Sequence, residues 1–407
     1  MRDADVVVIG GGAAGLSLAR RLTGPRTRSR RPLTVALVDA PPGELRAAPR
    51  TWCFWEAPGG EYDAVVRAHW GRLRITGRDG RTVVGNPGPL RYKMIRSPDF
   101  ERWAGAELDR AGCLRHEAVV ESVRDVPGGA EVRGHDARGA SVRLLARWVF
   151  DSRPPGRPGP ARTTLLQHFR GWFVRTARPA FDPGVADLMD FRTPQPRHGL
   201  AFGYVLPLGR HEALVEYTEF SGAVLDDDAY DRALGHYAAE VLGLGDLEVT
   251  AVEQGVIAMT DARFPRRTGR SVFPVGVAGG ATRPATGYSF AATQRHTRAI
   301  AAALARGRTP LVPAPHGARS LAMDAVLLRA LDTGRVDGAD LFTGLFEKVP
   351  AQRLLRFLDG RTTALEDVAV GLRTPVRPML RTALELPFLP RRPAGPRPVP
   401  ARRPAGP

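Results

Sequence analysis

Apolar and polar positions near the start of the chain follow the pattern of a strand, a helix and a second strand. Residues 6–9 form a β-branched run typical of a fully buried strand. A glycine-rich turn and apolar residues at helical spacing follow, and residues 33–38 form another buried strand that ends in Asp39. This order predicts a βαβ unit.

The middle of the chain has the alternation typical of strands. Residues 122–123, 130–132 and 141–144 alternate around glycine-rich turns, which predicts an antiparallel meander, and residues 148–150 form a further short strand. A later pair of alternating segments, 202–206 and 213–220, predicts a hairpin.

Helical spacing dominates between residues 322 and 370, so the fold class is mixed α/β with α+β character. Residues 371–407 differ, because they hold ten of the 36 prolines and eight arginines. Since proline interrupts helices, we expect no helix at 375–378 or beyond Pro387, and a disordered tail over residues 391–407.

The net charge of +17 comes almost entirely from arginine, because Lys93 and Lys348 are the only lysines. We interpret this excess as a coding bias that also favours contact with an anionic membrane. No RNA-recognition, zinc-finger or helix-turn-helix pattern accompanies the arginines, so nucleic acid is not an expected partner. Two cysteines are too few for a disulfide scaffold or a four-thiolate metal site, and no metal is expected.

The N-terminal segment does not have the pattern of a secretory signal, since Asp3 and Asp5 stand where basic residues are usual. The longest stretch without formal charge, 6–19, is shorter than the roughly 20 residues of a membrane-spanning helix. We therefore expect a cytoplasmic protein with peripheral contact at the inner face of the cell membrane.

A dinucleotide site is predicted where the first strand ends. Gly10 permits a tight turn, Gly12 lets a pyrophosphate approach the backbone, and Gly15 lets the helix pack closely on the strand. Asp39 ends the next strand, where a carboxylate binds ribose hydroxyls and repels a 2′-phosphate. Arg50 is a further candidate for contact with the pyrophosphate.

A second glycine cluster distinguishes FAD from NAD. It contains Gly279 and Gly280, follows an apolar strand, and precedes Gly287 and a helix that runs to about Ala305. Two-domain flavoproteins commonly bring such a late strand and helix beside the first βαβ unit. We therefore favour FAD, with these three glycines as cofactor-binding candidates.

Several blocks resemble those of bacterial lycopene beta-cyclases and occur in the family's order. They are TWCFWE (51–56), YKMIRS (92–97), FDSRP (150–154), QHFxGW (167–172), FDP (181–183), LMDFR (188–192), VExT (215–218), RPxTGYSF (283–290) and LLxFL (354–358). The resemblance implies an isomerase of carotenoid biosynthesis that forms β-rings at the ψ-ends of lycopene and related acyclic or monocyclic carotenoids. It also implies reduced FAD, with NAD(P)H as an electron source and no net redox change.

The resemblance further implies a Rossmann-like FAD domain interleaved with a sheet-and-helix substrate domain, as in FAD-dependent hydroxylase-type flavoproteins. The expected divisions are an FAD domain with an inserted sheet at 1–160, a substrate domain at 161–262, a return to the FAD domain at 263–310, a helical cap at 311–370, and the tail at 371–407.

The implied chemistry needs an acid beside an apolar pocket, and Glu216 matches the family's functional glutamate. Strand alternation places Glu216 on one face with Leu214, Thr218 and Phe220, where loss of hydration raises a carboxyl pKa. Glu219, on the opposite face, is expected at the surface.

Other polar and aromatic residues of the motifs have two readings each. Asp190 is either a second acid or the structural partner of Arg192, while Asp151 and Arg153 border the flavin pocket or cap a turn. His168 is expected to be a hydrogen-bonded pocket residue. The aromatic candidates for contact with a carbocation, which otherwise serve packing, are Trp52, Trp55, Trp172 and Tyr288.

Two alternatives remain open at this stage. An FAD-dependent monooxygenase acting on an apolar substrate would share the same nucleotide domain. In the tail, a mixed apolar and basic set predicts either a lipid-binding surface or a solvated end. This set comprises Leu380, Leu384, Leu386, Phe388 and Leu389 with Arg377, Arg381, Arg391 and Arg392.

Overall fold

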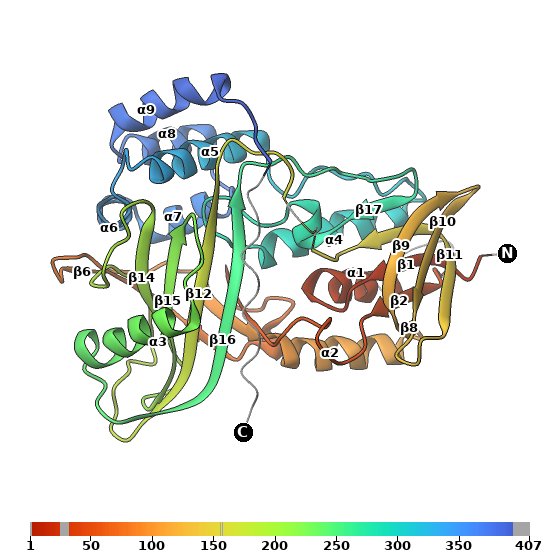
Figure 1. Ribbon diagram of the computed structural model, residues 1–407, viewed down its shortest axis with the longest axis horizontal. Helices are drawn as coiled ribbons and strands as arrows, with labels where there is room; N and C mark the ends of the chain where they lie inside the picture. Colours follow the sequence, from red (N-terminus) through yellow and green to blue (C-terminus); the bar gives the residue numbers. More distant parts are fainter. Residues whose placement is uncertain (1, 25–31, 155, 157, 394–407) are drawn as a thin grey trace.

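Two seven-stranded sheets occupy the two lobes of an elongated molecule (Figure 1). The computed structural model describes residues 2–24, 32–154, 156 and 158–393. The first lobe contains the N-terminal βαβ unit, and the second lobe contains the other large sheet with most of the C-terminal helices.

The first sheet has the order β8-β2-β1-β11-β10-β9, with β17 paired on β11. Strands β1, β2, β8, β11 and β17 pair in parallel, whereas β9, β10 and β11 form the predicted antiparallel meander. A single strand covers the two predicted segments 141–144 and 148–150. The bounds are β1 Ala4–Ile9, β2 Val35–Asp39, β8 Leu114–Glu117, β9 Val119–Val126, β10 Gly129–His135, β11 Ser141–Asp151 and β17 Val272–Pro274.

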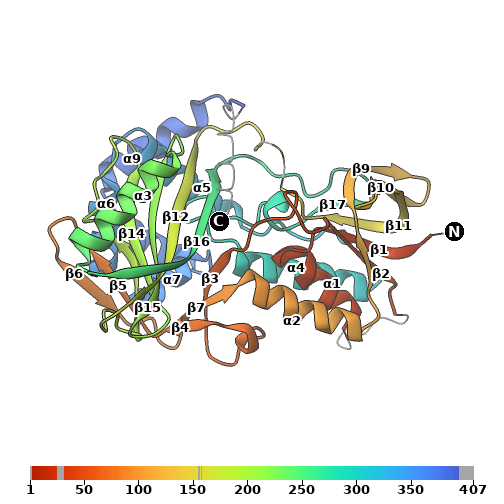
Figure 2. The same cartoon turned by 60° about the horizontal axis from the view of Figure 1, so that its bottom comes forward.

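Three helices pack on one face of this sheet: α1 (Ala13–Thr23), α2 (Ser97–Arg110) and α4 (Phe290–Ala305) (Figure 2). Alternate residues of β1 point to this helical face, and the intervening ones point to a core formed with the meander strands. The predicted βαβ unit and the late helix ending at Ala305 are therefore confirmed.

The second sheet has the order β16-β12-β15-β14-β13-β5-β6 and contains the predicted hairpin as β14 and β15. Only the β13–β5 pair is parallel. The bounds are β5 Arg72–Thr76, β6 Thr82–Gly85, β12 Thr164–Thr176, β13 Val185–Asp190, β14 Leu200–Pro207, β15 Glu212–Ser221 and β16 Leu247–Thr260.

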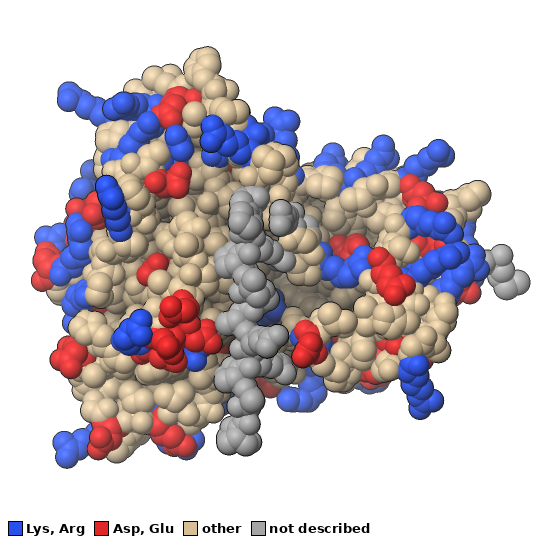
Figure 3. All heavy atoms as spheres, viewed as in Figure 1, with Lys and Arg blue, Asp and Glu red and all other residues tan. Residues whose placement is uncertain are grey.

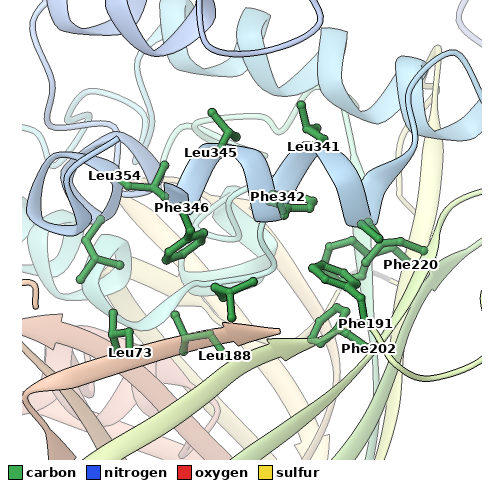
Figure 4. Packing of buried hydrophobic residues seen from close by; sticks show 14 of the residues in the cluster. Leu73, Leu188, Phe191, Phe202, Phe220, Leu341, Phe342, Leu345, Phe346 and Leu354 are labelled. Atoms are coloured by element: carbon green, nitrogen blue, oxygen red, sulfur yellow. The ribbon is translucent and has the colours of Figure 1, made fainter. Parts of the chain in front are cut away.

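Helices cover both faces of the second sheet. On one face lies α3 (Asp227–His236), and on the other lie α6 (Gly338–Lys348) and α7 (Ala351–Leu358). Phe342 and Phe346 of α6 point toward sheet residues such as Phe202 (Figure 4). Burial of this aromatic and aliphatic surface from water is the main force that holds the layers together.

A small sheet, β3 (Thr51–Glu56), β7 (Arg91–Arg96) and β4 (Ala68–Trp70), lies between the lobes (Figure 2). Residues of β3 and β7 contribute to the cores of both lobes. The first motif of the resemblance is therefore at the junction of the lobes.

The C-terminal region differs from the prediction. After α5 (Ala318–Asp332) and α8 (Ala364–Gly371), helix α9 spans Val376–Glu385, where the prolines were expected to prevent a helix. Pro375 is the N-cap and Pro378 lies in the first turn, where backbone N–H groups lack helical partners in any case. The helical prediction for 322–370 is confirmed by α5, α6, α7 and α8.

The disordered tail was predicted to begin at Arg391, which is too early in the chain. Arg391 Nη1 donates to the carbonyl of Asp261, and Arg392 pairs through its backbone with Ala161. Residues 394–407 lie outside the described residues. Within the described ranges, no helix is long and apolar enough to cross a bilayer.

Basic side chains on the face shown in Figure 3 are spread over both lobes and interspersed with acidic ones. In the arginine-rich loop after α1, residues 25–31 lie outside the described residues. On this face the charge therefore forms no single basic patch.

Candidate functional site

The predicted glycine motif lies at the carboxyl end of β1. Gly10 has a φ of +97°, and a Cβ on Gly15 would lie 1.9 Å from the carbonyl oxygen of Gly10. Both positions therefore require glycine. A Cβ on Gly12, the N-cap of α1, would meet no described atom within 4 Å, so the start of the helix faces open space. Helix N-termini favour anionic groups such as phosphates.

A groove of about 440 Å³ runs beside this helix start and is lined by Gly11, Asp39 and Arg46 together with residues of α2. Asp39 accepts a hydrogen bond from the backbone N–H of Gly11 at 2.8 Å and lies 3.2 Å from the Arg46 guanidinium. Arg50 is exposed, and Ser97 Oγ accepts a hydrogen bond from its backbone N–H. This groove fits the adenosine and phosphate groups of a dinucleotide.

The second glycine cluster lies between β17 and the start of α4. Gly279 and Gly280 end a turn after β17, and Gly287 precedes the helix with a φ of +71°. Near this helix start, the buried Gln167 Oε1 and Thr286 Oγ1 have no hydrogen-bond partner among the described residues. Since buried polar atoms are normally hydrogen-bonded, these two fit the polar edge of a ring such as flavin.

A cavity of about 180 Å³ lies between the second sheet and α6, next to the segment that leads into α4. Most of its lining is aromatic or aliphatic, with side chains from the second sheet, the small sheet, α6 and the segment before α4. Representative lining residues are Phe169, Leu188, Phe202, Leu214, Phe220 and Phe342. Such walls suit a hydrocarbon end group.

Glu216 points into this cavity with the three residues that alternation places on its face. Its Oε1 accepts a hydrogen bond from Thr218 Oγ1 at 2.7 Å. Burial, with a smaller contribution from the Glu253 carboxylate and against the lowering effect of the Thr218 bond, raises the pKa of the Glu216 carboxyl to about 8. The group is therefore mostly protonated at neutral pH, which suits a proton donor.

Glu219 is buried rather than at the surface, so this expectation was wrong. Glu219 is only 8% exposed. Tyr217 Oη donates a hydrogen bond to its carboxylate at 2.8 Å, and His168 Nε2 lies 3.5 Å from the other carboxylate oxygen. Alternation identified the opposite face correctly, but α3 covers that face.

The structure favours structural readings for Asp190 and Asp151. Arg192 donates to both oxygens of Asp190, at 3.0 and 2.6 Å, and Tyr237 Oη donates at 3.2 Å under α3. Arg153 pairs with Asp151 and donates to a backbone carbonyl of β9, which ties together the turn after β11.

The remaining candidates divide between the two faces. His168 is completely buried on the α3 side, where it bonds Tyr230 at 2.6 Å and Ser221 at 2.7 Å, and burial lowers its pKa to about 4. Trp172 packs on that side too. The cavity is lined by Trp52 and Tyr288, and Trp55 packs edge-on against Tyr288 with ring centres 4.8 Å apart.

Three polar residues of the cavity were missed by the sequence analysis: Glu253, Tyr92 and Tyr204. The Tyr92 hydroxyl bonds those of Tyr204 and Tyr288. Glu253 had a readable signal, because it is an acid within an apolar, β-rich stretch as Glu216 is. Tyr92 opens the YKMIRS block but was given no role, and Tyr204 had no signal, since the two tyrosines meet only in the folded chain.

The fold is that of flavin-dependent oxidoreductases, as predicted. A geranylgeranyl bacteriochlorophyll reductase-like protein from Thermoplasma acidophilum matches with a TM-score of 0.68 and 14% identity, over 94% of this chain and 99% of that one. A flavoprotein/dehydrogenase from Cytophaga hutchinsonii gives 0.63 and 13%, over 94% and 98%. The p-nitrophenol 4-monooxygenase of Pseudomonas putida gives 0.62 and 16%, over 95% and 98%. Identities this low establish the fold alone.

A search of curated proteins finds no match. The family model described as "Lycopene cyclase protein" matches residues 5–384, from β1 to the end of α9. This range includes the glycine motif, the hairpin with Glu216 and the helices over the cavity. The chain therefore belongs to the lycopene cyclase family.

Proposed function

We propose that the protein is an FAD-dependent lycopene beta-cyclase, which converts the ψ-end groups of lycopene and related acyclic or monocyclic carotenoids into β-rings. The observation that carries this proposal is the carboxyl group of Glu216, which has a pKa of about 8 inside an apolar cavity. A protein that must protonate an alkene near neutral pH needs such an acid.

Ring formation begins when Glu216 donates its proton to C2 of the terminal double bond. The resulting cation at C1 is captured by the C5=C6 double bond, and loss of the proton from C6 forms the β-ring. One proton enters and one leaves, so substrate and product are isomers and no net redox change occurs.

The chain itself protects the cation. The apolar walls keep water away from it, and the faces of Trp52 and Tyr288 offer π-electron density. Reduced FAD, when bound, supplies negative charge that favours a nearby cation. In this proposal NAD(P)H is the source of its electrons.

Residues of both glycine clusters would hold the cofactor. Gly10, Gly12 and Gly15 with Asp39 would bind its adenosine and phosphate part, and Arg50 would contact the pyrophosphate. At the other end, the flavin would lie against the turns that contain Gly279, Gly280 and Gly287. The support is the open start of α1 and the unpartnered polar atoms near the start of α4.

Expression in a lycopene-accumulating host tests the function. Chromatography of the pigments should show monocyclic or bicyclic β-ring products at the expense of lycopene. Unchanged lycopene in the presence of folded, flavin-loaded protein would contradict the proposal. The alternative monooxygenase would instead consume NAD(P)H and oxygen in proportion to substrate.

We also propose that helices α8 and α9 form the contact with the membrane that holds the substrate. Both carry exposed apolar residues at helical spacing: Leu365 and Val368 on α8 with Leu372 at its C-cap, and Val376, Leu380 and Leu384 on α9, followed by Phe388. Monomeric proteins rarely expose such a surface without a binding role. Arg373, Arg377 and Arg381 add positive charge suited to anionic lipid.

This surface differs from the predicted one. Leu386 is buried and Leu389 is partly buried, while Arg391 and Arg392 contact the body of the protein. The proposed lipid contact therefore includes α8, which the sequence did not suggest. It does not include Arg391 and Arg392, which the sequence did suggest.

Sedimentation with phosphatidylcholine–phosphatidylglycerol vesicles tests this contact. Changing Leu380, Leu384 and Phe388 together to serine should reduce binding about tenfold or more, because three exposed apolar side chains are lost. The matched control changes the exposed Val249, Val252 and Val256 of β16 to serine. Equal binding by both triple variants would contradict the proposal.

A further inference from the structure

A row of residues crosses four neighbouring strands of the second sheet on the face toward the cavity. Tyr204 of β14 pairs with Glu216 of β15, Glu216 pairs with Gly171 of β12, and Gly171 pairs with Glu253 of β16. Tyr204, Glu216 and Glu253 all line the cavity. Two carboxyl groups therefore flank a glycine on one face.

The neighbouring rows on this face are mostly apolar. The row on one side holds Phe202, Thr218, Phe169 and Gly255, and the row on the other side holds Leu206, Leu214, Phe173 and Ala251. The two acids thus belong to one narrow polar line within a hydrocarbon-like wall.

Gly171 leaves a gap between the acids. Neighbouring strands lie about 4.8 Å apart, so the backbones of Glu216 and Glu253 are about 10 Å apart. A Cβ on Gly171 would lie 2.8 Å from Leu214 Cδ1 and 3.4 Å from Glu216 Cβ, so the position does not accept a side chain without movement of these neighbours. Glycine inside a strand often marks the close approach of a ligand.

The two acids have different hydrogen bonds. Glu253 is 6% exposed, and its two oxygens accept bonds from the backbone N–H and the hydroxyl of Thr51, each at 2.6 Å. Burial raises the Glu253 pKa, and the two Thr51 bonds, which favour an ionised, acceptor-only carboxylate, oppose this rise. Among the described residues, Glu216 accepts a single bond, from Thr218 Oγ1, and burial raises its pKa to about 8. The second donor, on Glu253 alone, favours ionisation of Glu253 before Glu216, which is the order that a base and an acid need.

We propose that Glu253 is the base that removes the C6 proton in the cyclisation, a role that rests on the function proposed above. The C6–H bond breaks, its electron pair forms the C5=C6 double bond and neutralises the C5 cation, and the proton passes to a Glu253 oxygen. Because C2 and C6 are both bonded to C1, the two transfers occur on one ring, which lies over Gly171 between the carboxyl groups.

This arrangement balances the protons. Glu216 becomes a carboxylate when it protonates C2, and Glu253 becomes a neutral acid when it accepts the C6 proton. Transfer of that proton from Glu253 back to Glu216, directly or through water, restores both groups before the next ring forms. The place of Glu253 also directs deprotonation to C6 rather than C4, which selects the β-ring over the ε-ring.

The principal test is Glu253→Gln, assayed with lycopene in phosphatidylcholine vesicles and chemically reduced flavin. Glutamine retains the size of the side chain and can keep both contacts with Thr51, but an amide is not a base. We expect unchanged flavin content and a loss of cyclisation of at least about 100-fold. The residual product should contain a larger share of ε-rings.

A structural role of Glu253 would act only through its anchoring of Thr51 and β3. Thr51→Val removes one of the two bonds and leaves the carboxylate in place, so it should retain at least about ten times the activity of Glu253→Gln and form only β-rings. An equal loss in both variants, with an unchanged ratio of β- to ε-rings, would overturn the proposal.

Lycopene deuterated at C6 supplies a second measurement. If Glu253 is the base, Glu253→Gln should increase the isotope effect on ring formation, because deprotonation becomes slower than the steps before it. The role of Glu253 would be overturned if the Glu253→Gln variant kept the activity of the wild type and formed only β-rings. A wild-type protein that forms no rings would instead contradict the proposed function.

Discussion

The two faces of the second sheet both bury carboxyl groups, and they treat them differently. On the α3 face, Asp190 is held by Arg192 and Tyr237, and Glu219 by Tyr217 near His168. On the cavity face, Glu216 accepts a hydrogen bond from Thr218 and borders an open cavity whose lining is mostly apolar.

The difference teaches that burial alone does not identify a reactive acid. Burial raises the pKa of both Glu216 and Glu219, although the two residues are three positions apart on one strand. A closed network of partners fixes a group in a structural role. An acid that borders a cavity and has a raised pKa is available to a substrate.

The strongest test of this comparison is Glu216→Gln. We expect ring formation to fall about 1,000-fold, because the amide cannot donate a proton to an alkene. Flavin content and the melting temperature should stay close to those of the wild type. Retained cyclisation in the flavin-loaded variant would contradict the assignment of the acid.

On the α3 face, Asp190→Ala should lower stability rather than rate. The change leaves Arg192 and Tyr237 without their shared acceptor, at a cost of about 2 kcal/mol in the free energy of unfolding. Denaturant titration measures this cost, and the turnover per folded molecule should remain that of the wild type. Loss of turnover at full folding would show that the α3 face takes part in the chemistry.

The pH profile of cyclisation should follow the protonation of Glu216. Its pKa is raised to about 8, so the acid is present below that pH, and the rate should fall about tenfold per pH unit above it. Burial also shifts the pKa values of the other titratable groups that face it: that of Cys53 rises to about 12, and those of Tyr288 and Glu253 rise above their ordinary values. A rate that stays constant up to pH 10 would contradict this acid.

The smallest effect is expected for Glu219→Gln. The amide oxygen can still accept the Tyr217 hydrogen bond, so stability should change by no more than about 1 kcal/mol. Activity should stay within about twofold of the wild type in the pigment assay. This variant is therefore the matched control for Glu216→Gln on the same strand.

Much of the nucleotide lobe was predictable because its signals are local. The β-branched run, the glycine turn and the helix after it are contiguous, and they fold as the predicted βαβ unit. Glu216 could be assigned to a face because a strand alternates with a period of two, and the motif added a reason to choose it.

The errors arose where distant segments decide the outcome. Alternation places Glu219 opposite Glu216 but does not reveal whether water or a helix such as α3 covers that face. The proline rule failed at α9 because Pro378 falls within the first turn, where a missing N–H costs little.

The sequence by itself determined the local elements, the glycine-lined start of α1 and the family resemblance, since each depends on residues close together in the chain. Only the tertiary structure decided which polar groups meet. The line from Tyr204 through Glu216 and Gly171 to Glu253 depends on the register of four strands. Register is set by hydrogen bonds and packing between segments far apart in the chain, and no local pattern contains it.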